Sequence, residues 1–132
     1  QTPSISQYLT TRSGLSDLKV VGAFGIEGVG AGEGDAVLLW RSSSDRMTEM
    51  AQLAARRLKI PTKTVGQGLH TESLLAQRLL TNYPVITLSW PGADANVHLP
   101  TDTMESLDPE KVERAGRLLN LTTAVMATDP GY

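Results

Sequence analysis

The chain contains no cysteine, which excludes disulfides, thiolate metal sites and a cysteine nucleophile together. No apolar run approaches the roughly 18 residues that a membrane-spanning helix needs, and no signal peptide opens the chain. The chain also has no excess of positive charge, since it contains 12 Lys and Arg residues and 14 Asp and Glu residues. The composition therefore indicates no surface for nucleic acid or for an anionic membrane. Because the first residue is Gln1 and not methionine, we expect a processed chain or a piece of a larger protein.

What is present fits one ordinary globular domain. The 132 residues are 40% hydrophobic and 20% charged, enough for a single core. We expect an N-terminal arm or short helix over residues 1–17, a folded domain over 18–127 and a tail over 128–132.

The pattern of apolar residues predicts the elements of that domain. Compact apolar runs predict strands over 18–23, 36–40 and 84–89. Helical spacing and caps predict helices over 45–58, 72–81 and 109–127. Residues 65–69 are interpreted as a loop or an edge strand. The order strand, strand, helix, helix, strand, helix favours an α/β layered domain whose sheet is at least partly parallel.

Two helices carry a clear apolar face. In the first, the residues expected to be buried are Met47, Met50, Ala51, Ala54 and Leu58. In the last, they are Val112, Ala115, Leu119, Thr122 and Met126. Asp108 followed by Pro109 is a typical helix start, with an acceptor cap and proline at the first helical position.

The first candidate for chemistry is Glu27, inside the glycine-rich segment 25–32. An acid that follows a buried strand stands where α/β folds place ligand sites, and glycines let the backbone approach a ligand. On pattern alone, a glycine-rich turn with an exposed glutamate is the simpler interpretation. A nucleotide site is rejected, because a strand and not a helix follows the glycines, and no Gly-Lys-Ser/Thr is present.

The second candidate is His98, in a loop that also contains Asp102 and Thr103. A neutral imidazole is a good zinc ligand, and a nearby carboxylate can fix its tautomer. By spacing alone, a solvent-exposed loop histidine is the commoner case. His70 is the only other histidine, and the chain has no His-Glu-x-x-His pair.

Taken together, residues 18–126 resemble the C-terminal half of the co-catalytic, di-zinc aminopeptidase family. Three blocks carry the resemblance: Glu27 with its glycine turn, Pro84-Val85-Ile86-Thr87-Leu88, and the segment from His98 to Val112, which includes Asp102, Thr103 and Leu107-Asp108-Pro109-Glu110-Lys111. Glutamate at position 27 is most like the membrane-anchored branch. The resemblance implies part of a three-layer zinc-exopeptidase-like domain, with a small mixed or mainly parallel sheet flanked by helices.

The resemblance also implies an incomplete metal site. The family supplies further ligands through a His-x-Asp motif and its general base through a Glu-Glu pair, and this chain has neither. Glu27 and His98 would serve different zinc ions, each left with one protein ligand where a catalytic zinc normally has about three. Val97 stands where active members commonly have tyrosine, and His70 is at most a substitute polar residue. We therefore predict no catalytic residue and no cofactor in this chain, although the parent family uses zinc.

Two hypotheses from different classes follow. In the first, the chain is a non-catalytic or incomplete aminopeptidase-like domain that serves as a binding or structural module of a larger, extracytoplasmic and membrane-associated protein. Alternatively, it is the C-terminal fragment of an active metallopeptidase hydrolase whose other ligands lie upstream of Gln1. Under both hypotheses, the expected partner is the remaining half or another domain of the same protein. A third and weaker interpretation is that the local motifs resemble those of the family by chance.

Overall fold

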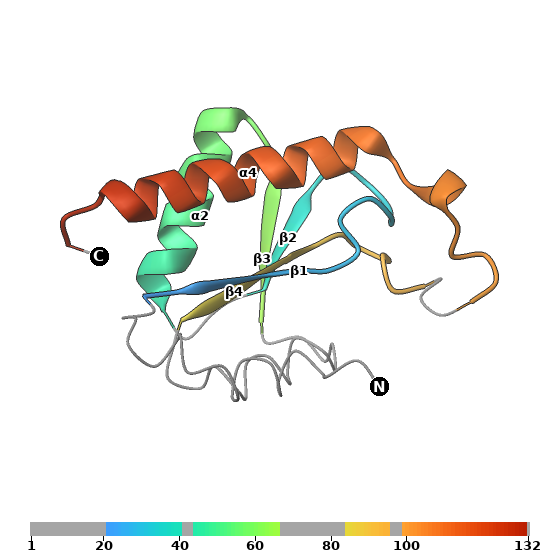
Figure 1. Cartoon of the computed structure of the whole chain (residues 1–132), viewed down its shortest axis with the longest axis horizontal. Helices are drawn as coiled ribbons and strands as arrows, with labels where there is room; N and C mark the ends of the chain where they lie inside the picture. Colours follow the sequence, from blue (N-terminus) through green and yellow to red (C-terminus); the bar gives the residue numbers. More distant parts are fainter. Residues whose placement is uncertain (1–20, 41–43, 67–83, 96–98, 132) are drawn as a thin grey trace, which may run out of the picture.

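The computed structural model describes residues 21–40, 44–66, 84–95 and 99–131 of the chain. Within them the strands are β1 (Ala23–Ile26), β2 (Val37–Trp40), β3 (Thr62–Val65) and β4 (Val85–Ser89). The helices are α2 (Asp45–Leu58), α4 (Pro109–Thr128) and the short 3-10 helix η2 (Met104–Ser106). The strands form one sheet, and α2 and α4 lie together over one of its faces (Figure 1).

The sheet is mixed, with the strand order β1-β4-β2-β3. β1 runs parallel to β4, and β2 runs parallel to β3, while β2 and β4 are antiparallel. The register places Phe24 opposite Ile86 and Leu39 opposite Leu88. The predicted α/β class with a small mixed sheet flanked by helices is therefore confirmed, and the described residues form two of the expected layers.

One apolar core lies between the sheet and the two helices. α2 and α4 pack against each other, and both begin at a side-chain cap: the Ser44 hydroxyl accepts from the Met47 amide, and the Asp108 carboxylate accepts from the Glu110 amide. The fully buried side chains of this core include Val37, Leu39, Met47, Ile86, Leu88, Trp90 and Leu118. Burial of this apolar surface is the main stabilising contribution to the fold.

Two sequence expectations need correction. The first strand begins at Ala23, so Val21 and Gly22 lie outside it, and it continues through Gly25. Glycine suits this position because a side chain has no room there: a β-carbon on Gly25 would lie 2.6 Å from the Thr87 hydroxyl oxygen on the neighbouring strand. The strand β3 was not predicted, and it ends at Val65, the first residue of the expected loop or edge strand at 65–69; residues 67–69 lie outside the described residues.

The buried faces of the two helices are mostly the predicted ones, but in α4 one predicted residue is exposed and one that was not predicted is buried. Val112 is 45% exposed, whereas Leu118, absent from the predicted set, is fully buried. Val112 lies in the first turn of α4, which extends beyond the sheet and contacts the loop at Gly30. The expected helix over 72–81 and the whole expected arm over 1–17 lie outside the described residues.

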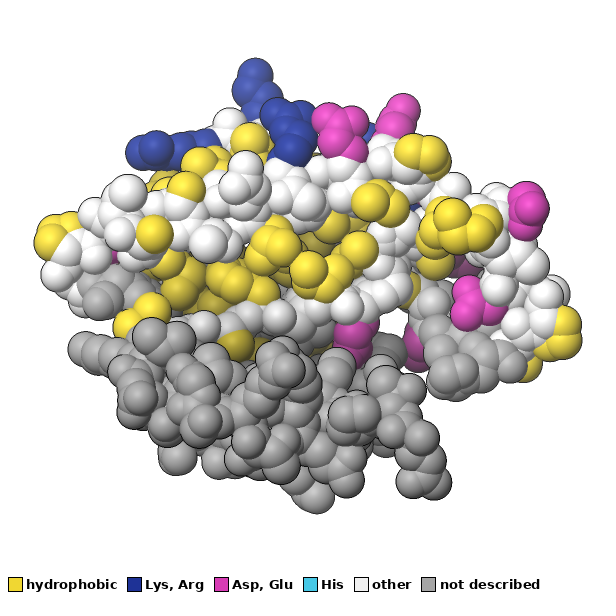
Figure 2. All heavy atoms as spheres, viewed as in Figure 1, with side chains coloured by type: hydrophobic (Ala, Val, Ile, Leu, Met, Phe, Trp, Pro, Cys, Tyr) yellow, Lys and Arg dark blue, Asp and Glu magenta, His cyan; other side chains and the backbone are white. Residues whose placement is uncertain are grey.

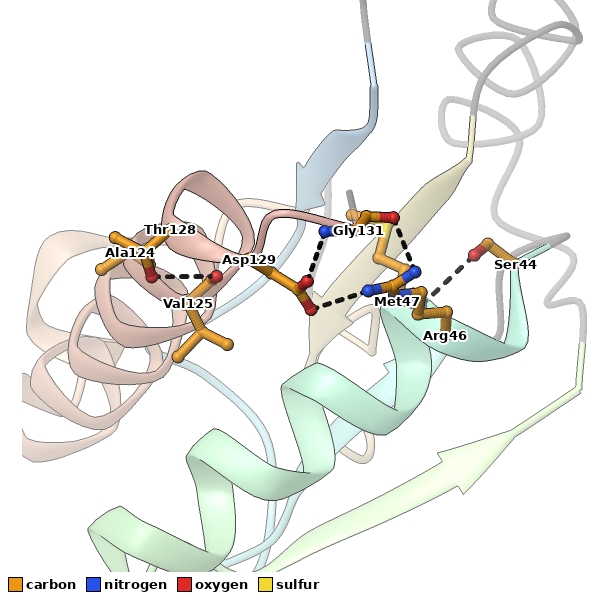
Figure 3. A network of polar contacts seen from close by, with 8 residues as sticks. All are labelled: Ser44, Arg46, Met47, Ala124, Val125, Thr128, Asp129 and Gly131. Carbon is orange, nitrogen blue, oxygen red and sulfur yellow. Dashed lines mark hydrogen bonds and ion pairs between the residues drawn. The ribbon is translucent and has the colours of Figure 1, made fainter.

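The C-terminal segment is fastened to the start of α2 (Figure 3). The Arg46 guanidinium donates to the Asp129 carboxylate at 2.8 Å and to the Gly131 carbonyl oxygen at 2.7 Å. The residues expected to form a tail are therefore attached to the folded domain as far as Gly131. Within the described part of the chain, no helix is both long and apolar enough to cross a bilayer.

Candidate functional site

Glu27 directly follows β1, at the carboxyl end of two parallel strands. Its amide donates to the Leu88 carbonyl oxygen at 3.0 Å, which extends the pairing of β1 with β4 by one residue. The side chain is only partly exposed, and its Oε2 atom is buried. Glu27 is thus held at the ligand-binding edge expected for an α/β sheet, and it is not the fully exposed glutamate of the simpler interpretation.

The glycine segment that follows Glu27 is docked onto the loop after β4. Gly28 and Gly32 have positive φ angles of 58° and 91°, and a β-carbon at either would overlap this loop, at Ala93 and at the Pro91 carbonyl respectively. The Glu33 amide donates to the Pro91 carbonyl oxygen at 2.8 Å. The glycines therefore serve a close backbone approach between two loops of the protein itself.

The first turn of α4 closes the same loop from another side. The Asp108 amide donates to the Gly30 carbonyl oxygen at 2.7 Å, and the Lys111 ammonium donates to the Gly32 carbonyl oxygen at 2.5 Å. Lys111 also lies 5.8 Å from the centre of the Trp90 ring, a cation–π distance. The Trp90 indole N–H donates to the Gly34 carbonyl oxygen at 2.9 Å, so the loop is held along its whole length.

Sequence reasoning missed the roles of Lys111 and Trp90 in this arrangement. The resemblance drew attention to the segment around Asp108, but as a helix start and not as a support for the loop of Glu27. One sequence feature could have indicated a contact with another segment: Trp90 directly follows the strand β4, and a buried indole N–H needs a hydrogen-bond acceptor.

Asp102 and Thr103 lie in an exposed turn ahead of α4. The Asp102 amide donates to the Leu99 carbonyl oxygen at 3.0 Å. A hydrogen bond from the Thr103 side chain is the main reason why the pKa of Glu105 is below its ordinary value. These contacts belong to a local turn and the start of η2, while His98 and His70 lie outside the described residues.

The sheet carries a buried polar group near the site, on the face away from α2 and α4. Thr87 and Ser89 alternate with the core residues Ile86 and Leu88, so their side chains point to the opposite face. The Trp40 indole donates to the Ser89 hydroxyl at 2.6 Å. The Thr87 hydroxyl is buried and has no hydrogen-bond partner among the described residues.

The described residues do not fit a zinc ion by themselves. No three His, Asp or Glu side chains within them come together as a metal site, whereas protein zinc sites use three or four ligands. Glu27 offers one carboxylate, and no second described ligand is shown beside it. No catalytic step through a metal is therefore derived from this arrangement.

No family profile and no curated protein matches the chain. Several solved structures are similar to the chain in fold. An aminopeptidase from Aneurinibacillus sp. strain AM-1 is 16% identical with a TM-score of 0.72, and the match covers 91% of this chain and 29% of that one. The LapA aminopeptidase of Legionella pneumophila is 15% identical with a TM-score of 0.74, covering 94% and 35%. The zinc aminopeptidase BSAP of Bacillus subtilis is 18% identical with a TM-score of 0.69, covering 92% and 31%.

These likenesses establish the fold. The chain has an α/β fold shared with part of several aminopeptidases, one of them described as a zinc enzyme, and it spans about a third of their length. The resemblance stated from the sequence is thereby supported at the level of the aminopeptidase fold. The closer likeness to the membrane-anchored branch stays a prediction.

Proposed function

We propose that this chain is an incomplete zinc-aminopeptidase-like domain that does not hydrolyse peptides by itself. It serves as a binding or structural module of a larger, extracytoplasmic and membrane-associated protein. The ligand count carries the proposal: the whole sequence has two histidines, no cysteine, no His-x-Asp and no adjacent glutamates. The fold supports it, because the chain matches 29–35% of the neighbours' chains.

The second candidate is a fragment of an active aminopeptidase that is completed by upstream residues. Glu27 favours it, because this carboxylate is retained at the end of β1 in a loop held from two sides. A metal ligand needs such fixed support from its surroundings. Under this candidate, Glu27 would bind zinc only when the other ligands are supplied.

The test compares this chain with the natural polypeptide that contains and extends it. Zinc content and hydrolysis of an aminoacyl p-nitroanilide are measured for both. The proposal expects neither bound zinc nor activity in the 132-residue chain, and no activity in an extended polypeptide that also lacks His-x-Asp and Glu-Glu. Activity in the extended polypeptide that Glu27→Gln abolishes, and that Glu33→Gln in the same loop leaves intact, would establish the second candidate instead.

A further inference from the structure

The Lys and Arg side chains of the described residues fall into two groups. Four of the eight have a carboxylate or carbonyl partner within the fold: Arg46, Lys111, Arg114 and Arg117. The other four are exposed and take part in no ion pair among the described residues: Arg56, Arg57, Lys59 and Lys63. Figure 2 shows Lys and Arg side chains gathered on the upper side of the molecule.

Three of the unpaired cations stand at the end of α2, next to a half-exposed leucine. Arg56 and Arg57 lie in the last turn of the helix, and Lys59 is its C-terminal cap. Leu53 is 39% exposed and precedes the two arginines by three and four residues, which is the spacing of neighbours on one helix face. We call these four residues the α2 surface. It combines positive charge with an apolar side chain.

The segment ahead of α4 combines apolar side chains with negative charge. Leu99, Met104 and Leu107 are 52%, 79% and 40% exposed. Met104 and Leu107 are three residues apart at η2, and a 3-10 helix places such side chains on one side. Asp102 and Glu105 are exposed among them and have no Lys or Arg partner within the described residues. We call these five residues the η2 surface, and neighbouring exposed apolar side chains of this kind are typical of an interaction site.

The η2 surface is held in place by the loop and helix beside it. The Asp108 amide donates to the Gly30 carbonyl oxygen at 2.7 Å. A β-carbon on Gly30 would lie 3.0 Å from the Leu107 side chain and 2.8 Å from that of Val112, so these two side chains lie side by side over the glycine loop. Val112 is itself half-exposed, and the apolar area therefore continues onto α4. A surface fixed in this way loses little conformational entropy on binding.

The two surfaces complement each other, but they do not meet within one molecule. Figure 1 shows η2 beyond the N-terminal end of α4, well separated from the last turn of α2. A helix commonly binds an apolar surface through side chains at positions i, i+3 and i+4, which is the spacing that the α2 surface offers. The net charge of the chain is only −2, so two copies repel each other little. A second copy of the chain thus supplies to each surface the side chains that it lacks.

We infer that the α2 surface of one copy of this chain docks on the η2 surface of a second copy. Leu53 lies against Met104 and Leu107, and the cations of the α2 surface face the two carboxylates of the η2 surface. Because the two surfaces differ, each outer copy keeps one of them free, and the assembly grows beyond a dimer. The inference goes beyond the proposed function and involves neither Glu27 nor zinc. Zinc content and peptidase activity of the same samples therefore report separately on the proposed function.

Sedimentation velocity of the 132-residue chain tests the contact. At about 20 mM salt the average mass should rise with protein concentration, and at about 500 mM salt it should return towards that of the monomer, because exposed charges are screened. Arg57→Glu and Glu105→Lys should each weaken self-association at least about tenfold, since each places like charges opposite one another. A mixture of the two variants should associate again, because every surface then finds one of opposite charge.

Lys63→Glu is the matched control, because it changes the net charge as much as Arg57→Glu does. The Gln52 side chain on α2 donates to the Thr64 hydroxyl at 2.8 Å, and neighbouring residues of a strand point to opposite faces. Lys63 therefore points away from the α2 surface, and its substitution should change self-association by less than about twofold. Met104→Gln tests the apolar part: it should weaken self-association about fivefold and leave the melting temperature of the monomer unchanged.

Three results would overturn the inference. The first is a chain that stays monomeric at every concentration in low salt. The second is an equal effect of Lys63→Glu and Arg57→Glu, because the overall charge and not the α2 surface would then be responsible. The third is a mixture of the two charge-reversed variants that stays monomeric, which would show that the two surfaces do not contact each other.

Discussion

The Lys111 ammonium and the Gly32 carbonyl oxygen are 2.5 Å apart, although the two residues are separated by 79 positions in the chain. This bond joins the first turn of α4 to the glycine-rich loop that follows Glu27. The Trp90 ring beside Lys111 belongs to a third segment, the loop after β4. The glycine segment is therefore a structural joint, and its sequence is explained by contacts within the protein.

Replacing Lys111 should weaken that joint. Lys111→Met keeps most of the apolar stem but removes the charged donor and the cation–π contact, so we expect a loss of about 1–2 kcal/mol in the free energy of unfolding. Urea denaturation measures it. Arg117→Met is the control, because its 3.8 Å pair with Glu113 is exposed and should cost at most about 0.5 kcal/mol. Equal effects would contradict the account of the loop.

Three glycine-to-alanine variants should separate steric overlap from backbone strain. At Gly32 a β-carbon would overlap the Pro91 carbonyl, and φ is 91°, so we expect the largest loss, about 2–4 kcal/mol. At Gly34 φ is 71° but the space is open, which leaves a cost of about 1 kcal/mol. Gly66 has open space and no positive φ, so the change there should be neutral or slightly stabilising. Thermal unfolding of the three variants should give this order, and any other order would refute the predicted close approach.

Thr87→Val should not destabilise the protein. The buried hydroxyl has no hydrogen-bond partner among the described residues, and valine has nearly the same shape. Removing an unsatisfied polar group stabilises by about 1 kcal/mol or is neutral. Ser89→Ala is the comparison, since it leaves the Trp40 indole without its 2.6 Å acceptor and should cost about 1–2 kcal/mol. A destabilising Thr87→Val would reveal a partner for that hydroxyl.

The contact between Arg46 and Asp129 should give stability a weak pH dependence. Arg46 holds the pKa of Asp129 below its ordinary value of 3.8. The carboxylate therefore stabilises the folded state above about pH 3.8, and this contribution is lost as the pH falls through the lower folded-state pKa. Asp129→Asn should lower the melting temperature slightly at pH 7, and the difference from the parent chain should vanish in acid. Asp94→Asn, at an exposed acid in the loop after β4, serves as the control; a difference that persists in acid would exclude this origin.

Local sequence patterns were enough to predict most of the described elements. α2 spans the predicted residues 45–58 because its cap, its apolar spacing and the following Pro61 all agree. The end of β1 was misplaced because Gly25 looks like the beginning of a turn, and only the approach of Thr87 from β4 explains a glycine within a strand. Sheet order could not be predicted either, since it depends on pairing between segments far apart in the sequence.

The candidate site was predictable only in part. The position of Glu27 after a buried strand is a local property, and the structure shows the residue there. Its support comes from Lys111 and Trp90, which lie 84 and 63 residues further along the chain, and a linear pattern does not show which distant segments such side chains contact. The expected relation between Glu27 and His98 stays a prediction, because His98 lies outside the described residues.

The central claim is that this chain carries an aminopeptidase-type fold without a working zinc site of its own. The most direct measurement is the melting temperature of the purified 132-residue chain with a chelator and with a small molar excess of zinc. A ligand that binds only the folded state raises the melting temperature by mass action. The account predicts no shift, and the same result for Glu27→Gln. A rise on adding zinc that Glu27→Gln removes would contradict it.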